Sequence, residues 1–139
     1  MIYLDTSALA KLVVEEAESA DLARWLDARS DDVLCTSTIT KVELVRAATR
    51  RSPQTRPAAL ALIAELALVP VDTTVVDTAW SLEPPELRSL DAIQLASALA
   101  LASQHVTFVT YDRRLADAAT AAGLETASPG PPRNGRTGA

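Results

Sequence analysis

Glycine, cysteine and histidine are scarce in this sequence, and each shortage excludes a class of functional site. All four glycines lie at or beyond Gly123. A P-loop or a dinucleotide-binding turn needs glycines early in the chain, where backbone N–H groups approach a phosphate, so both kinds of site are excluded. Cys35 is the only cysteine and His105 the only histidine. One cysteine cannot form an internal disulfide framework. One cysteine and one histidine also provide almost none of the residues that a zinc site or a Ser-His-Asp triad needs.

Positive charge is also in short supply. The chain has 13 basic and 18 acidic residues, which gives a formal net charge of −5. The molecule therefore has no global basic field that would attract a nucleic acid, and any such contact needs local arginines or bridging cations.

Long apolar runs and a secretion signal are missing as well. No run approaches the ~18–20 apolar residues of a membrane helix. The N-terminal stretch MIYLDTSALAK has no basic region followed by an apolar segment and a cleavage site. We therefore expect a cytoplasmic protein that makes no contact with a membrane.

The residues that are present predict an α/β fold with a mostly parallel sheet, because short apolar runs alternate with segments of helical spacing. The 139 residues are 48% hydrophobic, which suits one domain with one core. Ser7 is the expected N-cap of the first helix, Pro70 indicates an edge position for the third strand, and Gly123 suits the end of the last helix. Strands are expected at Met1–Leu4, Val33–Thr36, Leu68–Val71, Val106–Thr110 and Leu124–Ala127, with helices over 8–14, 18–28, 38–51, 58–67, 75–82, 89–102 and 112–122.

The last residues have a different composition. The stretch SPGPPRNGRTGA, residues 128–139, is rich in proline and glycine and poor in apolar residues. Such a segment cannot bury enough surface to order itself. We therefore predict a folded domain over residues 1–127 and a disordered tail over 128–139.

Two aspartates follow predicted strands. Asp5 comes directly after the first strand, and Asp112 follows the fourth. Ligands of open α/β sheets bind at the carboxyl ends of the strands, so both side chains are candidates for a site. An acidic residue at a helix N-terminus can equally be a cap, worth ~0.5–1 kcal/mol, and the spacing leaves both interpretations open.

Two further acidic residues lie within helical segments. Asp91 is the second residue of the stretch LDAIQLASALALA, which is apolar on nearly every face and is therefore expected to be buried. A buried carboxylate is costly, so Asp91 either faces the helix dipole or faces a polar pocket that holds a cation. Glu43 shares a helical stripe with Arg46 and Arg50, and this spacing is typical of a solvated face with Glu–Arg pairs.

Four stretches of the chain together resemble a known family. IYLDTSALAK, TSTITKVELVRA, LRSLDAIQLASAL and FVTYDRRLADAA resemble the motifs of PIN-domain ribonucleases, specifically the VapC-type toxins of bacterial type II toxin–antitoxin systems. They carry Asp5, Glu43, Asp91 and Asp112 in the family's order, and the resemblance extends from residue 1 to about 127. One departure is Gln94, where many relatives have a histidine.

The resemblance implies a fold, a site and an activity. The fold would have three layers, with helices on both sides of a sheet of strand order 3-2-1-4-5 and the acidic residues at its carboxyl edge. The activity would be that of a metal-dependent endoribonuclease acting on structured RNA such as tRNA. Asp5 and Asp91 would be the primary metal ligands, and Glu43 and Asp112 would bind the metal directly or through water.

The residue types are consistent with that chemistry. Carboxylates that lie close together repel one another unless a cation compensates them, and oxygen ligands without Cys or His select Mg²⁺, with Mn²⁺ as the alternative. Thr6, Ser7 and Thr110 could donate hydrogen bonds to such ligands or to water. Candidate contacts to RNA phosphates are Arg46, Arg88, Arg113 and Arg114.

The resemblance also implies partners, namely a cognate VapB-like antitoxin and a second copy of the chain in a homodimer. Two other kinds of function stay open. One is a different Mg²⁺-dependent phosphoryl-transfer domain. A receiver domain would need an acidic pair after the first strand and a lysine near the last strand. A haloacid-type phosphatase would need an aspartate at the position of Ser7. The other is a PIN-like module that binds proteins and has lost catalysis.

Overall fold

A five-stranded parallel sheet forms the centre of the molecule. The computed structural model describes residues 1–131, and its sheet has the order β3-β2-β1-β4-β5 with every neighbouring pair parallel. The α/β class, the parallel sheet and the strand order are therefore confirmed. The strands are β1 (Ile2–Leu4), β2 (Leu34–Ser37), β3 (Ala67–Val69), β4 (Thr107–Val109) and β5 (Glu125–Ala127).

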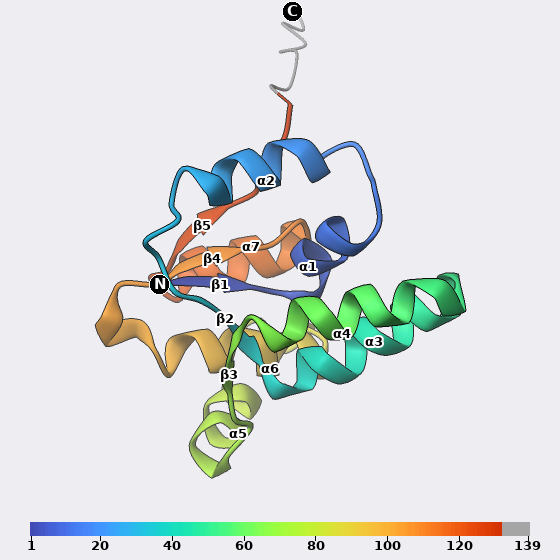
Figure 1. Cartoon of the computed structure of the whole chain (residues 1–139). Helices are drawn as coiled ribbons and strands as arrows, with labels where there is room; N and C mark the ends of the chain where they lie inside the picture. The colour runs from blue at the N-terminus through green and yellow to red at the C-terminus, as the bar shows by residue number, and fades with distance from the viewer. Residues whose placement is uncertain (132–139) are drawn as a thin grey trace, which may run out of the picture.

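Helices cover both faces of this sheet, which confirms the three-layer arrangement (Figure 1). The first four helices share one core cluster, α6 and α7 share the other, and α5 packs against α6 at the bottom of Figure 1. The α-helices are α1 (Thr6–Val13), α2 (Ser19–Asp27), α3 (Thr38–Arg51), α4 (Arg56–Ala64), α5 (Thr73–Trp80), α6 (Ser89–Leu99) and α7 (Arg113–Ala121), and two 3-10 turns are η1 (Pro53–Thr55) and η2 (Ala102–Gln104).

The central strand β1 shows why the sheet is buried on both sides. Side chains of a strand alternate between its two faces. Ile2 and Leu4 pack into the core beneath α1 to α4, whereas Tyr3 packs into the core beneath α6 and α7, where its ring stacks on Phe108 at 5.2 Å. All three β1 side chains are buried, as expected for a parallel sheet covered by helices.

The start of α1 differs from the prediction. Ser7 is not the N-cap: the helix begins at Thr6, and the carboxylate of Asp5 accepts the hydrogen bond from the N–H of Ala8. Asp5, the residue that follows β1, is the first residue whose side chain can cap α1. The helix therefore begins at the next residue, Thr6. Other boundaries shift by a few residues, and β3 ends at Val69, before Pro70, at the sheet edge that the proline indicated.

The C-terminal end of the described chain lies against the sheet. Gly123 has a positive φ of 94° and follows the end of α7, as predicted. Beyond β5, the Ser128 hydroxyl donates to the carbonyl of Thr110, and the Tyr111 hydroxyl donates to the carbonyl of Pro129. The first residues of the predicted tail thus contact the domain, and residues 132–139 of that tail lie outside the described residues. None of the helices in the described residues has the length and apolar character that a membrane span requires.

Candidate active site

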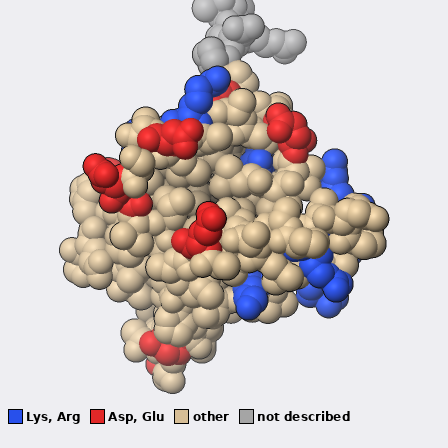
Figure 2. Space-filling model, in the orientation of Figure 1, with Lys and Arg blue, Asp and Glu red and all other residues tan. Residues whose placement is uncertain are grey.

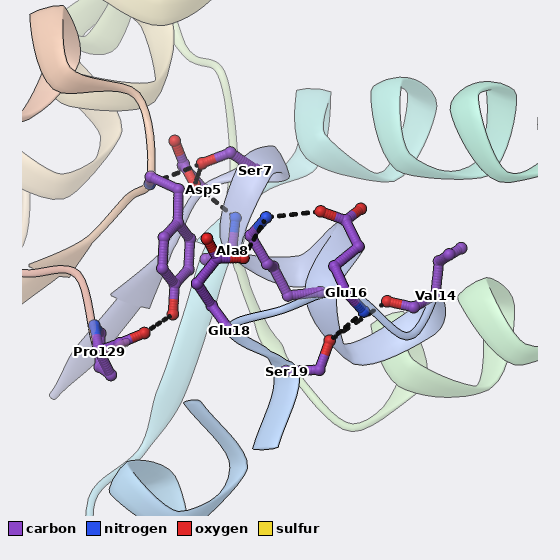
Figure 3. A network of polar contacts seen from close by, with 10 residues as sticks. Asp5, Ser7, Ala8, Val14, Glu16, Glu18, Ser19 and Pro129 are labelled. Carbon is purple, nitrogen blue, oxygen red and sulfur yellow. Dashed lines mark hydrogen bonds and ion pairs between the residues drawn. The ribbon is translucent and has the colours of Figure 1, made fainter. Parts of the chain in front are cut away.

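Asp5 is the most deeply buried of the four acidic candidates. Its side chain is 3% exposed at the carboxyl end of β1. Oδ1 accepts hydrogen bonds from the Ala8 N–H at 2.9 Å and from the Ser7 hydroxyl at 2.7 Å (Figure 3). Oδ2 accepts one from the Thr110 hydroxyl at 2.5 Å. Burial raises the pKa of Asp5 to about 6 against these hydrogen bonds, and the negative charge of Asp91 acts in the same direction.

Asp112 occupies the matching position after β4. Its Oδ1 accepts a hydrogen bond from the Leu115 N–H at 3.1 Å, so it caps α7 as Asp5 caps α1. Thr110 connects the two, because its hydroxyl donates to Asp5 and accepts from the Asp112 N–H at 3.0 Å. Since β1 and β4 are paired neighbours, the two capping aspartates lie at the same edge of the sheet.

Asp91 comes to this edge from the first turn of α6. The side chain is half-buried. Burial raises its pKa, and the negative charges of Asp112 and Glu43 raise it further, while Arg88 acts in the opposite direction. The charges of carboxylates from three separate elements thus act on one another.

Glu43 faces the interior rather than an arginine. Its Oε1 accepts hydrogen bonds from the Thr6 hydroxyl at 3.2 Å and from the Gln94 amide at 2.9 Å. The predicted solvated Glu–Arg pairing is wrong: no ion pair involving Glu43 occurs within residues 1–131, and Arg46 and Arg50 are exposed. The helical spacing of Glu43 with Arg46 and Arg50 predicted an exposed side chain. Glu43 faces inward because α3 packs against α1 and α6.

The donor chemistry of the four acidic residues fits a hard divalent cation. Asp5, Glu43, Asp91 and Asp112 contribute only oxygen atoms, and none of them forms an ion pair in the described part of the chain. Across residues 1–131 no three carboxylate, thiol or imidazole side chains are already drawn together around one point. The site is therefore an open group of carboxylates that have no ion-pair partner within residues 1–131.

A family model supplies the deciding comparison. The model described as "PIN domain" matches residues 2–121. The chain belongs to the PIN-domain family. It is 45% identical over 135 residues to the ribonuclease VapC35 of Mycobacterium tuberculosis, an alignment that covers 96% of this chain and 100% of that protein. The resemblance to VapC-type PIN-domain nucleases, and with it the enzyme class, is confirmed.

Solved structures show the same PIN fold at lower sequence identity. The crystal structure of M. tuberculosis VapC20, a toxin that cleaves the sarcin–ricin loop, matches with a TM-score of 0.72 and 22% identity over 93% of this chain and 100% of that one. A toxin–antitoxin complex from Klebsiella pneumoniae matches with a TM-score of 0.69 and 17% identity, covering 93% of this chain and 98% of that one.

Beside the acidic residues, the surface of this PIN domain has a hollow of about 950 Å³. Asp91 and Asp112 line one part of it, and Arg88, Arg113 and Arg114 line it as well. Three of the four predicted arginines thus lie next to the acidic group. Arg46, the fourth, is exposed on α3 and does not line the hollow.

The supporting polar residues were only partly predicted. Thr6, Ser7 and Thr110 donate hydrogen bonds to the acidic group, as their positions beside the motifs suggested. The buried contacts of Gln94 with Tyr3, Thr40 and Glu43 were not predicted. The sequence held one signal for these contacts, because Gln94 is an amide side chain inside an otherwise apolar helical segment.

Proposed function

We propose that this chain is a metal-dependent endoribonuclease and the toxin of a toxin–antitoxin pair. Its site would consist of Asp5 and Asp91 as primary ligands of Mg²⁺ or Mn²⁺, with Glu43 and Asp112 binding directly or through water. The observation that carries this proposal is the convergence of four unpaired carboxylates, from β1, α3, α6 and the end of β4, at one edge of a PIN-domain sheet.

The hydrogen bonds leave suitable oxygen atoms available. Each carboxylate oxygen has two lone pairs. Asp112 and Glu43 each use one oxygen for contacts within residues 1–131 and keep the other uncommitted. Asp5 keeps one lone pair on Oδ2, and Asp91 makes no hydrogen bond within the same residues. Hydrogen bonds thus fix the carboxylates of Asp5, Glu43 and Asp112 through some of their oxygen lone pairs. At least one lone pair of each carboxylate stays free for a ligand.

The residues of the site would divide the work on an RNA phosphodiester. A divalent cation supplies water activation and neutralisation of phosphate charge when it is bound. The carboxylates would hold that cation, and the hydroxyls of Ser7 and Thr110 would keep Asp5 oriented. Arg88, Arg113 and Arg114 would contact neighbouring phosphates in the hollow, which lets an acidic protein bind a polyanion. Structured RNA such as tRNA is the proposed substrate class.

The proposed partners follow from the family. The Klebsiella neighbour is a toxin–antitoxin complex, and we propose that this chain likewise binds a VapB-like antitoxin and forms a homodimer. The open hollow beside the carboxylates gives an antitoxin segment room to block the site. Both partnerships would be tested by co-purification with the antitoxin and by the mass of the purified complex.

RNA cleavage by the purified chain, measured with Mg²⁺ and with EDTA, tests the activity. We expect cleavage only with the metal, and a loss of at least about 100-fold in Asp91→Asn, because the amide keeps the size but removes the charge that binds a cation. Asp72→Asn is the matched control, since Asp72 caps α5 and lies outside the acidic group. Cleavage by Asp91→Asn at the wild-type rate would contradict the site assignment, and a wild-type chain without cleavage would favour a protein-binding module.

A further inference from the structure

Gln94 is a buried amide in the helix that carries Asp91. It lies three residues after Asp91 on α6, and its side chain is 2% exposed. A buried amide is costly unless its oxygen and both of its N–H groups have partners. The partners of this amide therefore indicate what it does.

The oxygen side of the amide is anchored to the interior. The Tyr3 hydroxyl donates to Gln94 Oε1 at 2.5 Å, and that hydroxyl in turn accepts a hydrogen bond from the Ser37 N–H at 3.1 Å. The Thr40 hydroxyl lies 3.1 Å from Oε1 and 2.8 Å from Nε2. Tyr3, Ser37 and Thr40 have no exposed surface, so this end of the amide is fixed by the sheet and by the first turn of α3.

The nitrogen side of the amide faces the acidic group. Nε2 donates to Oε1 of Glu43 at 2.9 Å and to the Thr6 hydroxyl at 3.1 Å, and that hydroxyl donates to the same Glu43 oxygen at 3.2 Å. A reversed amide would place its oxygen against the carboxylate oxygen of Glu43, where two acceptors repel. The ionised carboxylate therefore selects the orientation of the amide, and the amide in turn fixes the carboxylate.

We propose that Gln94 is a positioning residue, which holds one oxygen of Glu43 so that the other stays available to the cation bound by the acidic group. This role rests on the proposed nuclease function. A lysine or arginine could also hold Glu43, but its positive charge would compete with the cation. A neutral amide donates to the carboxylate and leaves the negative charge of the site intact.

The test measures the affinity for Mn²⁺ alone, by titration of the metal into the full chain, together with kcat and KM for RNA. Gln94→Glu is nearly isosteric but replaces the N–H donors with an acceptor facing Glu43. We expect Mn²⁺ affinity and kcat to fall about 10–100-fold, as for other partners of metal ligands, with little change in KM. Gln94→His restores a donor and should keep Mn²⁺ affinity within about threefold of wild type at pH 8.

A double-mutant cycle separates positioning from general packing. If Gln94 acts through Glu43, the charge-neutral change Gln94→Asn in a Glu43→Gln background should leave Mn²⁺ affinity as in Glu43→Gln alone, within about threefold. Ser97→Ala is the control, since Ser97 is buried on the same helix, donates to the Ile93 carbonyl and does not touch the acidic group. It should leave Mn²⁺ affinity and kcat unchanged.

The outcomes distinguish this role from the nuclease function itself. Wild-type Mn²⁺ affinity and kcat in Gln94→Glu would overturn the role of Gln94 while RNA cleavage by the wild type still stands. A wild-type chain that cleaves no RNA would overturn the nuclease function, and Mn²⁺ affinity would still test Gln94. Gln94→Glu also adds a negative charge near the cation, so Gln94→Asn, which adds none, is measured beside it and also serves if Gln94→Glu fails to fold. Gln94→Asn withdraws the amide by one methylene and should give the same fall, and an unchanged Mn²⁺ affinity would count against the role.

Discussion

Asp5 combines two roles that were alternatives at the level of the sequence. One oxygen caps α1 through the Ala8 N–H, and the other accepts from Thr110 and keeps a lone pair for a ligand. Asp112 is built in the same way on α7. Capping therefore does not argue against metal binding here. It holds each carboxylate rigid at the edge where a cation would be bound.

The raised pKa of Asp5 predicts how the stability of the metal-free protein changes with pH. The pKa is about 6 in the folded chain against an ordinary value of 3.8, so the folded state binds the proton more tightly than the unfolded state. The resulting stabilisation is fully present below pH 3.8 and is lost as the pH rises through 6. From pH 7.5 down to pH 5, protonation of Asp5 should add about 1 kcal/mol to the free energy of unfolding, and Asp91, whose pKa is also raised, acts in the same direction.

Denaturant unfolding in EDTA at the two pH values measures this effect. Asp5→Asn keeps an oxygen for the Ala8 N–H but cannot titrate, so it is the matched comparison. The free energy of unfolding of wild type relative to Asp5→Asn should rise from pH 7.5 to pH 5. A difference that is constant across this range would show that Asp5 has the same pKa in the folded and unfolded chains.

At the scale of elements, the site is built from the beginnings of helices. The helices that follow β1 and β4 begin with capping aspartates, and α6 brings Asp91 in its first turn. Helix N-termini carry a partial positive charge, which stabilises the carboxylates that gather there. The same partial charges favour a bound phosphate next to the acidic group.

Asp112 allows the capping role and the proposed ligand role to be separated within one element. Asp112→Asn should keep the cap of α7, and unfolding in EDTA should show unchanged or slightly higher stability because repulsion with Asp91 is relieved. Asp112→Ala removes the cap as well and should cost about 1 kcal/mol. Both variants should lose Mg²⁺-dependent cleavage. Equal losses of stability in the two variants would show that the charge, not the hydrogen bond, stabilises the start of α7.

The elements themselves were largely predictable, whereas the contacts between them were not. Apolar runs bounded by turns located all five strands, because a buried strand needs a short apolar run. The sequence predicted Ser7 as the N-cap of α1, although Asp5 is an equally good capping residue. The choice depends on where β1 ends, and because it ends at Leu4, Asp5 is the cap. The helical spacing predicted that Glu43 is exposed, and only the family resemblance placed Glu43 beside Asp91.

Gln94 shows why the rest of the site could not be read from the sequence. Its partners come from β1, α1 and α3, far from α6 in the chain, and they are Tyr3, Thr6, Thr40 and Glu43. Local periodicity carries no information on which helix crosses which, and one amide in an apolar helix is compatible with many partners. The arrangement follows only when the strand order brings these elements together.

At the scale of the whole molecule, the strand order creates the site. The chain passes from β1 outward to β2 and β3 and then returns to place β4 on the other side of β1. Ligands of open α/β sheets bind where the strand order reverses, and Asp5 and Asp112 flank that point. On the face shown in Figure 2, acidic and basic side chains are interspersed and form no broad basic surface. This charge pattern is consistent with the proposed mode of RNA binding, in which the local group of arginines and a bound cation would contact the phosphates.

A cation that relieves the repulsion among the four carboxylates should stabilise the whole fold. Because Mg²⁺ would bind the folded chain and not the unfolded one, the expected gain is RT ln(1 + [Mg²⁺]/Kd), about 1.4 kcal/mol at a tenfold excess over Kd. Thermal unfolding with EDTA and with millimolar Mg²⁺ measures it, and NaCl at the same ionic strength is needed because salt alone also screens the carboxylates. The gain beyond NaCl should disappear in Asp91→Asn. A melting temperature that Mg²⁺ and NaCl raise equally would mean that the carboxylates are screened but hold no metal, and the proposed site would then be wrong even if the fold is right.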